Sequence, residues 1–165
     1  MLKLTKKADY GLIALKHLAG RRTASASAKE IADRYLIPPP LLSKVLQQLS
    51  KGGLLTSVQG TNGGYRLAKD ARRITVLEVV RTIDGPIILT SCFSDPKAAH
   101  KECDQTSQCT VREPLRRVHE SILSLLDSIS IADLLDEGDH ECAPSEPERT
   151  LIQLSVPPQE VPTNG

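Results

Sequence analysis

The feature that most constrains the fold is the order of elements between Ser27 and Leu67. A short helix over residues 28–35 is ended by the run Leu36-Ile37-Pro38-Pro39-Pro40, because prolines block its continuation and favour the start of the next helix. A further helix then extends to Lys51. Gly52-Gly53 stops it, and two short strands flank a glycine-rich turn. This order predicts a winged helix-turn-helix, a mainly α fold with a small β-hairpin wing.

Local sequence signals place the helices around this unit. Apolar residues at helical spacing predict a helix over residues 5–19, and Gly20 follows as a stop. The pairs Ser27 with Glu30 and Thr75 with Glu78 have the spacing of capping boxes, which open helical turns. Thr110 with Glu113 has the same spacing and predicts the start of the last long helix.

Charge is distributed very unevenly along the chain. Residues 1–75 contain 14 Lys or Arg and 4 Asp or Glu, a net charge of +10, whereas residues 76–165 have a net charge of −9. A basic half is typical of a module that binds phosphates, so we expect the winged helix to bind double-stranded DNA.

Polar and basic side chains on the third helix and the hairpin are the candidate DNA contacts. Gln can pair with adenine, and Lys can reach guanine or a phosphate. The glycine-rich tip of the wing is small enough to approach a groove, where Tyr65 and Arg66 could support the hairpin and contact the backbone. The candidate DNA-binding residues are Pro40, Ser43, Lys44, Gln47, Gln48, Gln59, Thr61, Asn62, Tyr65 and Arg66.

Three of the four cysteines lie within 18 residues, as Cys92-x10-Cys103-x5-Cys109. No secretory signal or membrane span is evident, so we expect a cytoplasmic chain whose thiols stay reduced. Clustered reduced thiols indicate metal ligands or redox sensing more than disulfides. A thiol-redox enzyme is disfavoured, because the chain has no Cys-x-x-Cys pair and no recognisable catalytic base or small-molecule substrate pocket.

The last long helix has a seam of apolar residues that advance by three and four positions, which favours homodimerisation over packing within one chain. The seam consists of Leu115, Val118, Ile122, Leu125 and Ile129. We therefore expect four regions. They are a winged helix-turn-helix domain (1–84), a cysteine-rich loop (85–110), a dimerisation helix with a short C-terminal helix (111–137), and a disordered acidic, proline-rich tail (138–165).

Several segments together resemble the IscR/NsrR-like family of winged-helix transcription regulators, and within it the regulators of SUF-type iron-sulfur cluster assembly. The resemblance covers residues 1 to about 137. It rests on MLKLTKKADYGLIALKHLA, IPPPLLSKVLQQLSKGGLL, QGTNGGYRLAKD, ITVLEVVRTIDGPIILTSC and the three cysteines. It implies a dimeric, operator-binding regulator, a repressor, that senses iron-sulfur cluster status and controls cluster-assembly genes.

The resemblance also implies the cluster ligands. The three thiolates fall on Cys92, Cys103 and Cys109, and the cluster could be of the two-iron or four-iron type. Some members use a histidine three residues after the last cysteine, where this chain has Arg112, which cannot ligate. Others use an acidic residue of the partner subunit's first helix, where Asp9 falls; His100 is a rival, and Cys142 is interpreted as a spare thiol. The alternatives are a nitric-oxide- or redox-responsive repressor of the same family, or a constitutive DNA-binding module stabilised by zinc.

Overall fold

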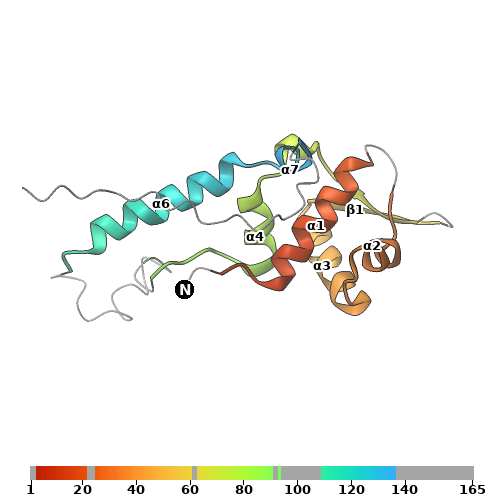
Figure 1. Ribbon diagram of the computed structural model, residues 1–165, viewed down its shortest axis with the longest axis horizontal. Helices are drawn as coiled ribbons and strands as arrows, with labels where there is room; N and C mark the ends of the chain where they lie inside the picture. The colour runs from red at the N-terminus through yellow and green to blue at the C-terminus, as the bar shows by residue number, and fades with distance from the viewer. Residues whose placement is uncertain (1–2, 22–24, 61–62, 91–92, 94–108, 137–165) are drawn as a thin grey trace, which may run out of the picture.

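The computed structural model describes residues 3–21, 25–60, 63–90, 93 and 109–136, and Figure 1 shows their arrangement. The first three helices and the hairpin follow each other as the sequence predicts, and a 3-10 helix after the hairpin was not predicted. In chain order the described elements are α1 (Lys6–Gly20), α2 (Ala28–Tyr35), α3 (Pro39–Lys51), β1 (Leu55–Val58), β2 (Gly64–Leu67), the 3-10 helix η1 (Ala71–Arg73), α4 (Val76–Asp84), α6 (Arg112–Ser128) and α7 (Asp133–Asp136).

Side-chain caps begin three of the helices, and the caps of α2 and α4 are those that the sequence predicts. The hydroxyl of Thr5 accepts a hydrogen bond from the backbone of Ala8, at the start of α1. Ser27 caps α2 and Thr75 caps α4 in the same way, each accepting from the backbone N–H three residues on, at 3.1 and 3.2 Å. These bonds satisfy donors that a helix leaves unpaired at its first turn, so each start is fixed locally.

The main core lies where α1, α3 and α4 meet. Leu15, Leu46 and Val79 are fully buried there, and aliphatic side chains supply nearly all of the packing. Gly11 allows the close crossing of α1 and α4, because a Cβ at this position would lie 2.4 Å from Ile83 Cδ1. The second helix of the helix-turn-helix, α3, is therefore packed against both α1 and α4.

The wing is an antiparallel β1–β2 hairpin in which Leu55 pairs with Leu67 and Val58 with Gly64. It has an additional attachment that the sequence did not predict. Ala26, just before α2, exchanges two backbone hydrogen bonds with Tyr65, of 3.0 and 2.9 Å. The base of the wing is thereby bonded to the segment that leads into the helix-turn-helix.

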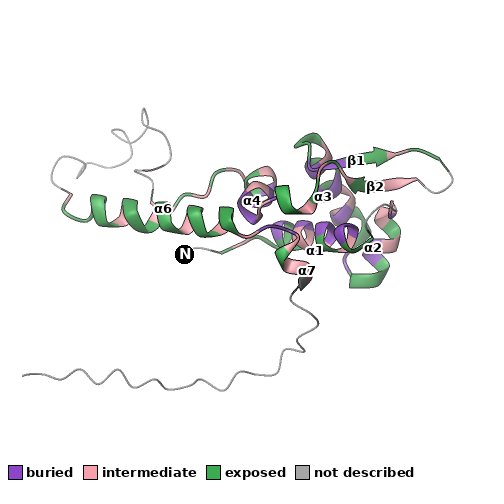
Figure 2. Cartoon of the chain, turned by 90° about the horizontal axis from the view of Figure 1, so that it is seen from above, coloured by how far each residue is buried: buried purple, intermediate pink, exposed green. Residues whose placement is uncertain are grey.

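α6 projects from the helical body, and the wing lies at the opposite end of the molecule in both views (Figures 1 and 2). No residue within α6 is buried. Thr110 was predicted to cap this helix, and that prediction is wrong. Val111 occupies the capping position and has no side-chain acceptor, and Pro114 in the first turn has no N–H that would need one.

None of the helices in the described part of the chain is long and apolar enough to cross a membrane.

Candidate DNA-binding and sensor sites

The exposed face of α3 is the leading candidate for contact with a ligand. Leu42, Val45, Leu46 and Leu49 are buried and hold the other face of α3 against the core. This leaves Lys44, Gln47 and Gln48 exposed, together with Pro40 at the leading end, and Ser43 half-buried. Within the described part of the chain, no hydrogen bond or ion pair engages the side chains of Lys44, Gln47 and Gln48. Their polar groups are therefore available to another molecule.

The turn between α2 and α3 has an unusual backbone. Leu36 adopts the left-handed conformation, with φ of +53° and ψ of +37°, and ends α2. Its side chain is 91% exposed, so no packing contact compensates for the strained backbone. Ile37 immediately after it is buried and attaches the turn to the core. The turn thus has a defined geometry that fixes where α3 begins.

Residues of the wing divide into two groups. Gln59 and Arg66 are exposed, whereas Tyr65 is half-buried and packs against the main core. Tyr65 therefore supports the hairpin, one of the two roles predicted for it. Thr61 and Asn62 lie outside the described residues. Lys69, just after β2, donates hydrogen bonds of 2.7 and 2.8 Å to Glu78, which attaches the base of the wing to α4.

Of the four candidate cluster ligands, Asp9 and Cys109 fall on described residues, and Cys92 and Cys103 lie outside them. Cys109 is a free, half-buried thiol three residues before α6. Asp9 is an exposed carboxylate in the first turn of α1, without a hydrogen bond or ion pair from its side chain to any described residue. A free thiol and an unengaged carboxylate have the donor chemistry that a cluster or zinc requires.

The structure does not bring these two ligands together within one chain. The start of α6 lies apart from α1 in both views (Figures 1 and 2). Among the residues that the structure describes, no three His, Cys, Asp or Glu side chains are grouped as a metal site. Sharing of one site between Cys109 and Asp9 would therefore need a second copy of the chain.

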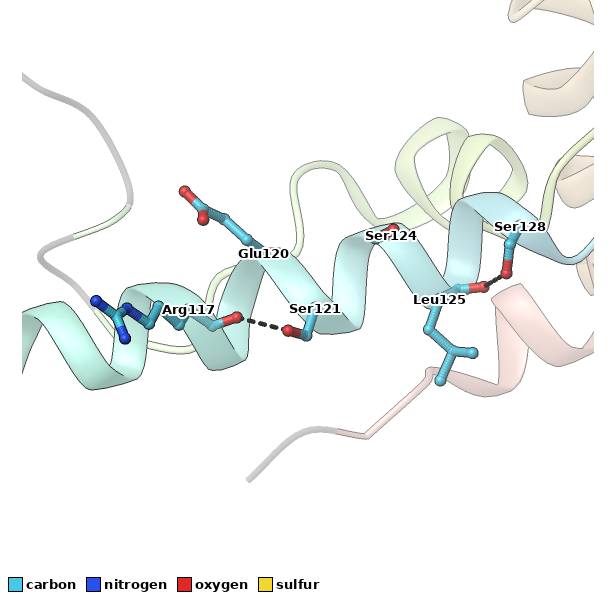
Figure 3. Close-up of a pocket in the computed structure, with 6 residues that line it drawn as sticks. All are labelled: Arg117, Glu120, Ser121, Ser124, Leu125 and Ser128. Carbon is cyan, nitrogen blue, oxygen red and sulfur yellow. Dashed lines mark hydrogen bonds between the residues drawn. The ribbon is translucent and has the colours of Figure 1, made fainter.

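One face of α6 leaves apolar side chains in solvent. Val118 is 50% and Leu125 61% exposed, whereas Ile129, at the end of the predicted seam, packs against Val76 and Val80 of α4. Leu125 lies on an open surface of α6 (Figure 3) that it shares with Arg117, Glu120, Ser121, Ser124 and Ser128. The hydroxyls of Ser121 and Ser128 donate to carbonyl oxygens of α6 itself, at 2.8 Å. These serine side chains are therefore small, and their hydroxyl donors already have acceptors within α6.

Ionic contacts support the same helix. Arg116 donates two hydrogen bonds to Glu113, of 3.0 and 2.6 Å, and also contacts Glu120. The hydrogen bond from Arg116 is the main reason that the pKa of Glu113 lies below its usual value. These ion pairs are exposed and add little to stability. They do pair the charged side chains of Glu113 and Glu120 with arginines of the same helix.

His17 and Tyr35 form a contact between α1 and the end of α2 that the sequence did not suggest. The two rings pack edge to face, and His17 Nδ1 lies 3.2 Å from the Tyr35 hydroxyl oxygen. Burial, and then the positive charges of Arg21 and Arg34, lower the pKa of His17 below 6.5. The neutral imidazole is therefore the form that the fold favours.

Comparison with known proteins assigns this architecture to a family. Residues 4–137 match the Rrf2 family, which is described as iron-dependent transcriptional regulators. The chain belongs to the Rrf2 family. It is 36% identical over 143 residues to an HTH-type transcriptional regulator of Rhodobacter capsulatus described as rrf2-like, and the match covers 82% of this chain and 94% of the relative.

Two solved structures of Rrf2-type regulators resemble it closely. CymR, the global cysteine regulator of B. subtilis, superposes with a TM-score of 0.67 at 28% identity, over 84% of this chain and all of CymR. IscR of T. potens superposes with a TM-score of 0.64 at 31% identity, over 82% of this chain and 87% of IscR. The expected winged-helix fold is confirmed, and this Rrf2 protein is a DNA-binding transcriptional regulator rather than an enzyme.

Proposed function

We propose that this regulator senses iron-sulfur cluster status and adjusts its binding to an operator accordingly, as a repressor of cluster-assembly genes. The observation that carries the proposal is the triad Cys92-x10-Cys103-x5-Cys109, which ends three residues before α6 in a chain whose family is described as iron-dependent. Three soft thiolates close together suit an iron-sulfur cluster.

DNA reading is assigned to α3 and the wing. In a winged helix the second helix of the helix-turn-helix enters the major groove with its N-terminal residues leading. Pro40, Ser43, Lys44, Gln47 and Gln48 occupy the available face of α3, and this position supports their role in contacting bases and phosphates. On the wing, Gln59 and Arg66 are exposed and Tyr65 holds the hairpin in place, while Thr61 and Asn62 complete the proposed wing contacts.

The regulator acts as a homodimer through α6. Val118 and Leu125 are apolar and exposed on a helix that projects from the body, and pairing two such helices would remove them from water. Ser121, Ser124 and Ser128 beside them are small enough to allow a second helix to approach. Two-fold pairing also suits DNA, because half-sites about one turn, roughly 34 Å, apart must be read together.

The fourth ligand in this proposal is Asp9 of the partner subunit. Its carboxylate is exposed and unengaged, and the described residues of one chain contain no group of three His, Cys, Asp or Glu side chains that could hold a metal. A bound cluster would supply a bond between the loop of one subunit and α1 of the other, and its oxidation or loss would break that bond. While the bond exists, Asp9 would hold its own DNA-binding unit in a fixed position relative to the other subunit. When the bond is broken, a small rotation of that unit would change operator affinity.

Purification without oxygen, followed by absorption spectroscopy with iron and sulfide analysis, tests the proposal. We expect brown protein with matched iron and sulfide. The colour should disappear in Cys109→Ala and persist in Cys142→Ala, which removes the spare thiol as a matched control. Colourless protein that contains zinc, or no metal after reconstitution, would contradict cluster sensing and leave the DNA-binding function intact.

A further inference from the structure

A pair of stacked rings joins the cysteine-rich loop to α6. Phe93, which directly follows Cys92 in sequence, stacks on His119 near the middle of α6. The ring centroids are 5.3 Å apart and the rings are inclined by 26°, a favourable geometry for offset stacking. Both residues are half-buried, and the backbone N–H of Phe93 donates to Thr90 at 3.0 Å. His119 Nδ1 is buried without a hydrogen-bond partner among the described residues, and the contact with Phe93 is a ring-to-ring one.

The other end of α6 is fixed to the DNA-binding half. The backbone of Val76 donates to Ile129 at 2.9 Å, and the hydroxyl of Thr75 donates to Asp127 at 3.0 Å. Leu126 packs with Ile129 against the start of α4. Since a helix rises about 1.5 Å per residue, His119 lies roughly 15 Å along α6 from this attachment. A displacement of His119 would therefore change the angle of α6 relative to α4, because α6 is attached at its C-terminal end.

His119 and the residue before it point in different directions. Successive residues of a helix are separated by about 100° around its axis, so Val118 lies on another face from His119. Val118 shares the exposed apolar face with Leu125, the face assigned above to the partner subunit. A change in the ring contact on one side of α6 would thus displace the dimer contacts on the other.

We propose that Phe93, through its stack on His119, is the positioning residue by which the cysteine-rich loop sets the orientation of α6. The inference rests on the proposed cluster ligation, because one peptide bond joins Phe93 to the candidate ligand Cys92. A change in what Cys92 binds alters the position of the Phe93 ring, and His119 passes that change to α6. The distance and angle between the two α3 helices of the dimer then depend on whether the loop holds a cluster.

The test compares operator affinity in two states of each variant. Cluster-loaded and cluster-free proteins are measured against one selected operator for the wild type, Phe93→Ala and Phe93→Tyr. Ile88→Ala is the matched control, since Ile88 is an exposed apolar residue of the same segment. We expect Phe93→Ala to load the cluster normally, with unchanged iron content and absorption, but to bind the operator equally in both states. Phe93→Tyr and Ile88→Ala should keep the wild-type ratio. A wild-type ratio in Phe93→Ala would overturn the proposal.

A second measurement does not depend on the cluster. In cluster-free protein, amide hydrogen exchange in the first half of α6 should be roughly three- to tenfold faster in Phe93→Ala than in Ile88→Ala, since an aromatic pair contributes about that factor. Unchanged exchange in Phe93→Ala would overturn the positioning role. If the wild type binds no cluster but exchange does change, the sensing function has failed and the attachment of α6 by Phe93 stands.

Discussion

Leu36 stores backbone strain at the turn that places α3. A leucine with φ of +53° sits in a region that costs about 1–2 kcal/mol for a residue with a Cβ, and glycine avoids most of that cost. We expect Leu36→Gly to raise the free energy of unfolding by about 0.5–1 kcal/mol, because the 91% exposed side chain contributes little packing. Urea unfolding measures this change in the free energy of unfolding. Leu36→Ala is the control, since it shortens the side chain without relieving the backbone. Equal stability of the two variants would show that the turn is not strained.

His17 makes the fold sensitive to mild acid. Its pKa is lowered in the folded protein, first by burial and then by Arg21 and Arg34, so the unfolded chain binds a proton more readily than the folded one. The stability it contributes is therefore complete above its unfolded pKa of 6.5 and is lost as the pH falls toward the lowered value.

The variant His17→Gln tests this pH dependence, because glutamine can still hydrogen-bond to the Tyr35 hydroxyl but does not titrate. Urea midpoints at about pH 7.5 and about pH 5.5 should differ less in the variant than in the wild type. The same loss of stability in both proteins would show that His17 does not carry the pH dependence.

At the scale of elements, the wing depends on its attachment to Ala26. A Cβ at Gly64 would lie 2.3 Å from the carbonyl oxygen of Ala26 and 2.6 Å from its carbon, both backbone atoms that cannot rotate away. We expect Gly64→Ala to destabilise the protein by about 1–3 kcal/mol and to weaken operator binding by displacing the wing. Gly20→Ala is the matched control, because its nearest contact is an ordinary 3.8 Å to Leu135. If Gly64→Ala unfolds and binds like the control, Ala26 does not position the wing.

The sequence predicted the elements whose determinants are local. Ser27 and Thr75 each act on the backbone three residues away, so their helix starts could be located from neighbouring residues. The bonds between Ala26 and Tyr65 join segments 39 residues apart and use only backbone atoms, which leave no pattern in the side chains. The same holds for the candidate sites. The exposed face of α3 followed from helical periodicity, whereas the stack of Phe93 on His119 joins residues that lie far apart in the sequence and follow no common pattern.

For the whole molecule, the proposed dimerisation through α6 would bring two DNA-binding units together on one operator. We expect Leu125→Asp to make the protein monomeric, because it places a charge in the centre of the proposed apolar contact. Sedimentation at micromolar protein measures the change, and operator affinity should fall with it. Leu36→Asp is the matched control for sedimentation alone, since it converts an even more exposed leucine that lies outside α6. A dimeric Leu125→Asp protein would place the subunit interface elsewhere.

If the state of the cysteine-rich loop controls DNA binding, operator affinity must differ between the protein with and without the cluster. One selected operator duplex is titrated without oxygen at one salt concentration, because phosphate contacts make affinity strongly salt-dependent. Coupling of this kind changes affinity by roughly 5- to 150-fold. We expect a change in that range for the wild type and its loss in Asp9→Ala. Equal affinity of the loaded and cluster-free wild-type proteins would show that the loop does not control DNA binding.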